Sequence, residues 1–224
     1  MPRLPRIDLG DQIYHVINRA NARLPIFFEE ADYLMFEKIL IEAKERYDMR
    51  ILAYCLMPNH FHLVLYPRQE KDLQKFMQWV TLTHTQRWHE KNKTVGTGHL
   101  YQGRYKSFLV QGGNYLLAVI RYVERNPLRA NLVRKAENWN FSSLYQKLNN
   151  SDIKNTLLSP WPISEPKDYL DFVNTSMNKK EEDAIRYSVN RGKPFGGDTW
   201  SINTIKEYGL EATIRNRGRQ IKGT

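Results

Sequence analysis

The sequence predicts an α+β fold in which helices flank an antiparallel β-sheet. The first observation is the order of the apolar patterns, which along the chain reads strand, helix, strand, strand, helix, strand, helix. The second is the pair Pro58-Asn59, which separates two apolar runs and predicts a turn between antiparallel strands. No train of strand–helix–strand crossovers is visible, which argues against a parallel sheet. With 224 residues, 41% of them hydrophobic, the chain can bury a sizeable core, and wholesale disorder is excluded.

The first elements follow from alternation and helical spacing. Residues 12–19 alternate in polarity, which predicts a strand. One face of that strand carries Ile13, His15 and Ile17. Apolar side chains at helical spacing predict a helix over residues 29–47. Residues 50–57 and 60–66 are nearly continuous apolar runs, which predict the two paired strands.

The next elements are a helix, a strand and a helix. Helical spacing over residues 71–91 predicts a second helix, and residues 104–110 predict a strand. Gly112-Gly113-Asn114 then predicts a turn with Asn114 as a helix N-cap. Residues 115–125 carry a helical apolar stripe, which Asn126-Pro127 ends.

The composition divides the chain into two parts. Residues 1–150 form a main domain, and residues 151–224 form a linker followed by a basic helical extension. The linker is predicted up to about residue 166, because that stretch is polar and rich in proline. Two short helices are expected in the extension, over residues 168–173 and 180–189. The extension ends in a basic segment that includes Arg217 and Arg219. Truncation near residue 150 is expected to leave the main domain's active residues in place.

The charge of the chain favours a polyanionic partner. It carries 34 Lys and Arg against 24 Asp and Glu, a formal net charge of +10, and each neutralised phosphate releases condensed counterions. The single cysteine, Cys55, excludes a disulfide scaffold and a cysteine-based zinc site. No apolar run is long enough to span a membrane. We expect a cytoplasmic protein that binds nucleic acid and no membrane.

Positive charge is concentrated in residues 104–135, where the cations are opposed only by Glu124. Aromatic side chains are interleaved with them, as on a surface that stacks bases while it follows a phosphate backbone. The alternative is that the cations solvate one face of an ordinary fold whose core the aromatic residues fill. The side chains of this segment that we expect to contact DNA are Arg104, Lys106, Arg121, Tyr122 and Arg125.

His60 and His62 flank Phe61 in a predicted strand. Alternation points both imidazoles to one face and Phe61 to the other, so that two metal-ligating nitrogens lie side by side. The pair indicates half of a divalent-metal site. The alternative is a turn residue at His60 and a hydrogen-bonded core histidine at His62.

Two tyrosines are candidate nucleophiles. A phenol with a pKa of about 10 attacks a phosphodiester when a base or a metal-activated phosphate assists it. Tyr115 follows Asn114 at the predicted helix start, where backbone N–H groups favour a phosphate. Tyr122 lies about two turns further along the same face, so periodicity does not choose between them. The alternative for each is a core aromatic residue.

Four sequence motifs occur in this order along the chain: YHVINR at 14–19, LMPNHFHLV at 56–64, GHLYQGRYKS at 98–107 and YLLAVIRYVERNPLRANLV at 115–133. Together they resemble the REP-associated tyrosine transposases, relatives of the single-tyrosine HUH transposases of small insertion sequences. The resemblance covers about residues 12 to 148. It implies a ferredoxin-like or RRM-like palm with the two histidines on a central strand, and it makes residues 1–150 the catalytic domain. It also implies a bacterial, nucleoid-associated protein.

The resemblance also implies roles for particular residues. His60 and His62 would bind magnesium or manganese, and Tyr115 would form a 5′-phosphotyrosine and free a 3′-hydroxyl. Related transposases carry a glutamine ligand one helical turn after the tyrosine, where this chain has Val119. The segment RGKPFGGDTW at 191–200 and the basic end resemble an extension of some family members. That resemblance implies minor-groove DNA contact by Arg217 and Arg219, although Gln220 replaces a proline there.

The first hypothesis is a metal-dependent DNA strand transferase that cleaves and rejoins single-stranded DNA at hairpin-forming repeats, as a monomer or homodimer. The second is a non-catalytic hairpin-binding protein on the same fold. The third is a metal-dependent nuclease that uses water as the nucleophile. A covalent protein–DNA product separates the first hypothesis from the other two.

Overall fold

The fold is centred on a four-stranded antiparallel sheet. The computed structural model describes residues 7–149 and 157–215. The strands lie in the order β2-β3-β1-β4 and are β1 (Ile13–Arg19), β2 (Arg50–Met57), β3 (His60–Tyr66) and β4 (Lys106–Val110). This order, with one helix after β1 and another after β3, is that of a ferredoxin-like sheet. The predicted α+β fold is confirmed, as is the antiparallel pairing on either side of Pro58-Asn59.

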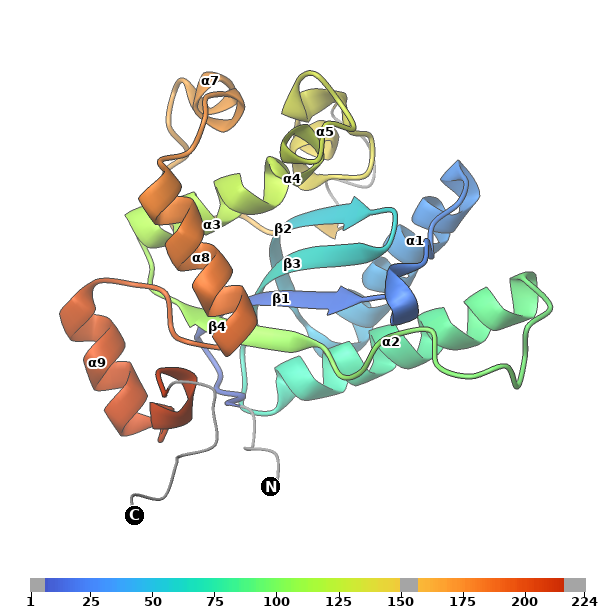
Figure 1. The fold of residues 1–224 in the computed structure, drawn as a ribbon, viewed down its shortest axis with the longest axis horizontal. Coiled ribbons are helices and arrows are strands. Elements are labelled where there is room, and N and C mark those ends of the chain that lie inside the picture. The colour runs from blue at the N-terminus through green and yellow to red at the C-terminus, as the bar shows by residue number, and fades with distance from the viewer. Residues whose placement is uncertain (1–6, 150–156, 216–224) are drawn as a thin grey trace, which may run out of the picture.

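Helices cover both faces of the sheet (Figure 1). On one face lie α1 (Glu30–Tyr47) and α2 (Asp72–Lys91), and on the other lies α3 (Asn114–Glu124). β2 is buried on both of its faces, because one set of its side chains packs in each of the two cores. This double burial is the reason why residues 50–57 form a continuous apolar run rather than an alternating one.

The strand register fixes the position of the two histidines. Antiparallel pairing puts His60 opposite Arg19 and His62 opposite Ile17, at the end of β1. Phe61 points to the opposite face, where its ring centroid lies 4.8 Å from that of Phe36 in α1. The predicted separation of the two imidazoles from the phenyl ring is therefore confirmed.

α3 begins at the end of the sheet that is remote from these histidines. β4 runs antiparallel to β1 and ends at Val110, which pairs with Ile13 at the start of β1. The turn that follows uses Gly113 as the helix N-cap, with a φ of 68° that glycine adopts without steric cost. Asn114 is the first helical residue and makes no capping hydrogen bond, which differs from its predicted role as the N-cap. The helix then runs back along the sheet toward the histidines (Figure 1).

The remaining elements are short helices and 3-10 turns around the palm. They are η1 (Asn21–Arg23), α4 (Asn126–Arg129), η2 (Ala136–Asn138), α5 (Ser143–Leu148), α7 (Tyr169–Asn174), α8 (Lys179–Arg191), α9 (Asp198–Glu207) and η3 (Glu211–Thr213). α7 and α8 confirm the two helices predicted in the extension, and α9 is a helix that the sequence pattern does not predict.

The described part of the extension packs against the palm. Leu157 is fully buried in the core, and the Trp161 indole N–H donates to the Leu52 carbonyl at 2.8 Å. Phe195 forms a parallel bridge with Val110 of β4. Residues 157–163 are therefore part of the packed structure, although the sequence predicts a linker there. The boundary near residue 150 stays a prediction.

Two further predictions concern DNA contacts near the end of the chain and the lack of a membrane-spanning segment. Arg217 and Arg219 lie outside the described residues. Among the helices of residues 7–149 and 157–215, none is long and apolar enough to cross a membrane.

Candidate active site

A cavity of about 200 Å³ lies between α8, the α3–α4 segment and the ends of β1 and β3. We call it the histidine cavity. Its lining residues come from five elements and are Ile17, Arg19, His60, His62, Tyr122, Arg129, Arg186, Val189 and Asn190. The cavity thus brings together two imidazoles, one phenol and several guanidinium groups.

The Nδ1 atom of each cavity histidine already has a partner. His60 Nδ1 lies 2.7 Å from Asn59 Oδ1, and the Asn59 amide group donates to the Arg23 carbonyl, which fixes the orientation of the carboxamide. His60 Nδ1 therefore carries the proton, and its Nε2 keeps a lone pair. His62 Nδ1 lies 2.8 Å from Nε2 of the buried His15. In both rings, Nε2 is the nitrogen left for a ligand.

The two cavity imidazoles are neighbours and neutral. Their ring centroids lie 5.1 Å apart, with an angle of 75° between the planes. Burial, and to a lesser extent the positive charges of Arg19 and Arg129, lowers the pKa of His60 to about 3. Burial is the main cause that holds the pKa of His62 well below its usual value, and the neighbouring His15 and His60 lower it as well. Neutral imidazole is the form that binds a metal ion.

Among the described residues, His, Cys, Asp and Glu side chains alone do not complete a donor set for a metal. Over residues 7–149 and 157–215, no group of three His, Cys, Asp or Glu side chains is arranged to hold a metal ion. Two neutral imidazole nitrogens suit a divalent transition metal better than magnesium, which prefers oxygen ligands. The remaining ligands would have to be other protein atoms, water or a bound phosphate.

Tyr122 is the tyrosine that reaches the histidine cavity. Its ring centroid lies 6.0 Å from that of His62 and 6.4 Å from that of His15. The guanidinium of Arg129 lies over the ring, 4.6 Å from its centroid. Tyr122 is only 5% exposed, so its position is held by packing on both sides.

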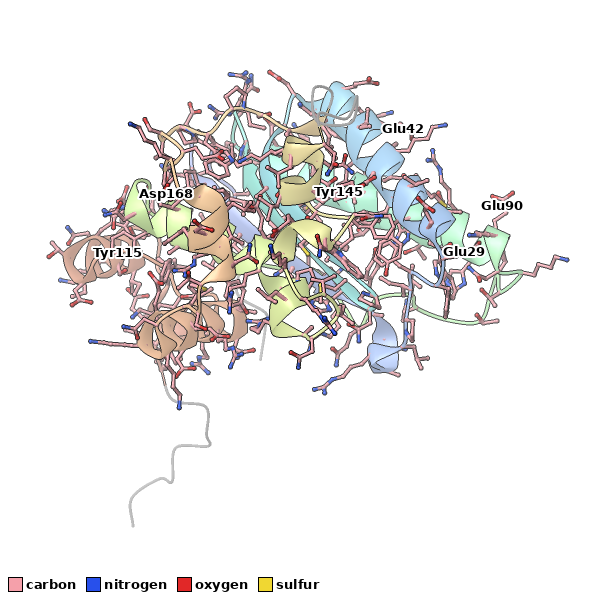
Figure 2. All side chains as sticks on the ribbon, turned by 90° about the horizontal axis from the view of Figure 1, so that it is seen from above. Glu29, Glu42, Glu90, Tyr115, Tyr145 and Asp168 are labelled. Atoms are coloured by element: carbon pink, nitrogen blue, oxygen red, sulfur yellow. The ribbon has the colours of Figure 1, made fainter. Side chains whose placement is uncertain are left out.

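Tyr115, the predicted nucleophile, lies elsewhere. It is 36% exposed at the start of α3, and its ring packs edge-on against Phe195, with centroids 5.6 Å apart. It does not line the histidine cavity. Figure 2 shows Tyr115 at the outer end of α3, beside the C-terminal helices. The structure thus brings Tyr122, and not Tyr115, to His60 and His62.

Three guanidinium groups surround the histidine cavity, from Arg19, Arg129 and Arg186. Glu182 of α8 accepts from Arg129 at 3.2 Å and from Arg186 at 2.6 Å, so one carboxylate holds two of these cations in place. Arg129 also donates to Asn126 Oδ1 at 2.5 Å. The predicted DNA contacts Arg104 and Lys106 line a neighbouring hollow, which shares Arg19 with the cavity.

Arg121 and Arg125 have a structural role that the sequence does not predict. Arg121 donates to the carbonyl of Thr175, and Arg125 to those of Val173 and Asn174, at the C-terminal end of α7. Cations are favoured there by the unpaired carbonyls and the helix dipole. Arg121 is 6% exposed, which leaves its guanidinium little access to a DNA strand.

The sequence patterns do not identify several residues of the site. His15 is on the correct face of its predicted strand, but only the pairing of β1 with β3 brings it to His62. Arg129 and Asn126 follow Tyr122 by seven and four residues, a helical spacing that would have selected them once Tyr122 was taken as the reference. Arg186 lies in the extension, and no local signal connects it to the histidines.

Comparison with known proteins identifies the family. The family model for IS200-like transposases matches residues 9–126, more than half of the chain. The chain therefore belongs to the IS200-like transposase family, whose members cleave and transfer DNA strands. No curated protein matches the chain.

Two solved structures are similar to the chain. A REP-associated tyrosine transposase bound to a REP hairpin is 16% identical, with a TM-score of 0.56, and the match covers 69% of this chain and 90% of that one. This likeness confirms the fold. A transposase-like protein from Deinococcus radiodurans R1 is 19% identical, with a TM-score of 0.38, and the match covers 55% of this chain and 96% of that one.

Proposed function

We propose that the protein is a metal-dependent DNA strand transferase of the REP-associated type. It cleaves and rejoins single-stranded DNA at hairpin-forming repeats through a 5′-phosphotyrosine. The observation that carries the proposal is the histidine cavity, which His60, His62 and Tyr122 line together with Arg129 and Arg186. The hairpin bound by the structurally similar transposase supports hairpin DNA as the partner.

Tyr122 is the nucleophile that this geometry favours, in place of Tyr115. An attacking oxygen has to lie close to the phosphorus atom that the other active groups hold. Tyr122 lines the same small cavity as the two histidines, whereas Tyr115 contacts Phe195 at the other end of α3. The helix-start argument that favours Tyr115 applies only if a phosphate binds there, and Tyr115 does not line the cavity that contains His60 and His62.

His60 and His62 would hold the metal ion, magnesium or manganese, through their Nε2 atoms. For His62, this requires that Nδ1–H donates to His15 Nε2, so that the Nε2 lone pair faces the metal. The bound ion would polarise the scissile phosphate. One helical turn after Tyr122 stands Asn126, whose carboxamide oxygen now accepts from Arg129. Asn126 is our candidate for the third protein ligand, because Val119, one turn after Tyr115, has no atom that can bind a metal.

The reaction is a transesterification. The Tyr122 phenol loses its proton as its oxygen bonds to phosphorus, and the bond between phosphorus and the 3′-oxygen breaks. The 3′-oxygen takes up a proton and leaves as a hydroxyl. Rejoining is the reverse step, in which a 3′-hydroxyl attacks the phosphotyrosine. Arg129 and Arg186 would contact the non-bridging phosphate oxygens, where charge has to be balanced.

A covalent adduct tests the proposal directly. The full chain is incubated with manganese and single-stranded oligonucleotides that carry hairpins, and the products are resolved on a denaturing gel. We expect a metal-dependent band in which protein and oligonucleotide migrate together. A gel shift under native conditions without any adduct on the same DNA favours the non-catalytic hairpin-binding protein, and free cleaved DNA without adduct favours the nuclease.

A further inference from the structure

A second cavity lies behind α4 and contains four cationic side chains. Its volume is about 480 Å³, and α4, α7 and the chain between them line it on the α3 side of the sheet (Figure 1). We call it the arginine pocket. Its cations are Arg125, Arg129, Arg134 and Lys135. Among the described residues, only Arg129 lines both this pocket and the histidine cavity.

Hydrogen bonds hold the walls of the arginine pocket in place. The Asn174 carboxamide, in α7, accepts from the Ala136 backbone N–H at 2.9 Å and donates to the Glu137 carboxylate at 2.7 Å. Arg125 donates to the carbonyls of Val173 and Asn174 at 3.0 and 2.7 Å. These bonds tie α7 to both neighbouring walls. The pocket is therefore formed before a ligand arrives, which lowers the entropic cost of binding.

The positive charge of the pocket is only partly balanced. Arg134 and Lys135 are exposed, and within residues 7–149 and 157–215 neither enters an ion pair. Guanidinium and ammonium groups make charge-assisted hydrogen bonds with phosphate oxygens. The cations of the arginine pocket therefore favour a ligand that carries phosphate groups.

Carboxylates and leucines distinguish the arginine pocket from the hollows around the histidines. Glu137 and Asp171 line it, whereas no Asp or Glu lines the histidine cavity or the hollow beside it. A carboxylate repels a phosphate backbone, but it accepts a hydrogen bond from a ribose 2′-hydroxyl, a group that DNA lacks. Leu128 and Leu170 add apolar surface on which a base can pack.

We propose that the arginine pocket binds a free ribonucleoside polyphosphate. Its phosphates contact Arg134 and Lys135, and a ribose hydroxyl donates to Asp171. Glu137 is already held by Asn174, whereas among the described residues Asp171 enters no ion pair. The base packs against the two leucines. The three parts of a ribonucleotide thus meet three kinds of side chain in one cavity.

Arg129 connects this site to the histidine cavity. Its guanidinium lies over the Tyr122 ring, 4.6 Å from the centroid, and it also lines the arginine pocket. A ligand shifts an equilibrium only by its differential affinity for the two states. Here that difference is the attraction between the nucleotide phosphates and Arg129, which draws the guanidinium away from Tyr122. A bound nucleotide therefore slows adduct formation. This consequence, unlike the binding itself, rests on the proposed function.

The binding is tested with ATP as the probe, by calorimetric titration of the full chain without divalent metal. We expect ATP to bind more tightly than dATP or pyrophosphate. Arg134→Ala with Lys135→Ala should weaken ATP binding about tenfold or more, and Asp171→Ala should remove the preference for ATP over dATP. Lys179→Ala with Lys180→Ala removes the same charge from the exposed start of α8, outside the pocket. This matched control should bind ATP as the wild type does.

Three results would overturn the binding proposal. The first is that ATP does not bind to the wild type, or binds equally well to the Arg134 and Lys135 double variant. The second is that pyrophosphate binds as tightly as ATP, which contradicts the roles of Asp171 and the leucines. The third is that the double variant binds hairpin DNA more weakly but ATP unchanged, which assigns the pocket to DNA.

Adduct formation tests the link through Arg129 separately. Free manganese is held constant, so that chelation by ATP does not change the supply of metal. ATP should lower the single-turnover rate of the wild type about fivefold or more. The double variant should form the adduct at the wild-type rate, with or without ATP. Equal inhibition of both proteins contradicts the link, whereas ATP binding without any adduct supports the pocket and contradicts the strand transferase.

Discussion

His15 and His62 are joined across the β1–β3 pair by a hydrogen bond of 2.8 Å between His15 Nε2 and His62 Nδ1. His15 is fully buried, and its ring centroid lies 4.9 Å from that of Phe108 in β4. The ring of a cavity histidine is therefore oriented by a residue that does not itself line the cavity.

Replacing His15 should weaken metal binding without removing a ligand. His15→Phe keeps an aromatic ring beside Phe108 but removes the hydrogen bond to His62. We expect the affinity for manganese, measured by calorimetric titration, to fall about tenfold or more, because the orienting partner of a ligand histidine is lost. His15→Gln offers a carboxamide oxygen to His62 Nδ1–H and should restore part of the affinity. An unchanged affinity in His15→Phe would argue against His62 as a ligand.

Removing the Arg129 guanidinium should slow the chemical step more than it weakens DNA binding. Arg129→Ala removes the cation over the Tyr122 ring and a contact for the phosphate. We expect the single-turnover rate of adduct formation to fall about a hundredfold, and the DNA affinity to fall by about tenfold at most, because other cations remain. Arg134→Ala, an exposed cation outside the histidine cavity, is the control. Equal rates in the two variants would contradict the assignment.

Truncation near residue 150 should abolish cooperative folding. Leu157, Val173 and Ile185 are fully buried, so their loss exposes apolar surface of the palm. The sequence predicts that the main domain survives this cut, whereas the packing predicts that residues 1–150 alone give no sharp thermal transition in circular dichroism. A transition close to that of the full chain would support the two-domain prediction instead.

Glu37 makes stability depend on pH. Burial raises the pKa of its carboxyl from 4.5 to about 7 in the folded protein, while hydrogen bonds from Tyr54 and Gln146 oppose that rise. The folded state therefore holds a proton that the unfolded chain releases, and this contribution to the free energy of unfolding is present below about pH 4.5 and is lost as pH rises through about 7.

Glu37→Gln should remove this dependence. The variant keeps an oxygen that can accept from the Tyr54 hydroxyl, which now lies 2.6 Å from Glu37 Oε1. We expect it to be more stable than the wild type by on the order of 2 kcal/mol at about pH 8, and to show no such advantage at about pH 4. Urea unfolding at both pH values measures the difference. A constant difference between the two proteins would show that Glu37 does not titrate in this range.

Alternation and helical spacing predict which side chains share a face, and those predictions agree with the structure. His60, Phe61 and His62 separate to two faces because a strand has a period of two, whatever its neighbours are. The same reasoning cannot say which end of a helix meets which end of a strand. Tyr115 and Tyr122 share a face of α3, and the direction in which the chain leaves β4 determines which of the two lies near the histidines. That direction depends on strand pairing.

The other differences between the predicted site and the structure arise from long-range packing. Arg121 and Arg125 lie in a segment whose composition is typical of a DNA-binding surface. In the structure, however, they contact carbonyls at the end of α7, about fifty residues later in the chain. Arg186 reaches the histidine cavity only because α8 lies over β4. No periodicity within residues 104–135 contains this information, since it depends on how the extension packs.

Tyr122, rather than Tyr115, should form the covalent bond with DNA. Trypsin separates the two candidates, because cleavage after Arg121 puts Tyr115 in the peptide 107–121 and Tyr122 in the peptide 122–125. Mass spectrometry of the digested adduct should find the nucleotide on the peptide 122–125. Tyr122→Phe should form no adduct, and Tyr115→Phe should form it as the wild type does. A nucleotide on the peptide 107–121, or an adduct that persists in Tyr122→Phe, would contradict the account.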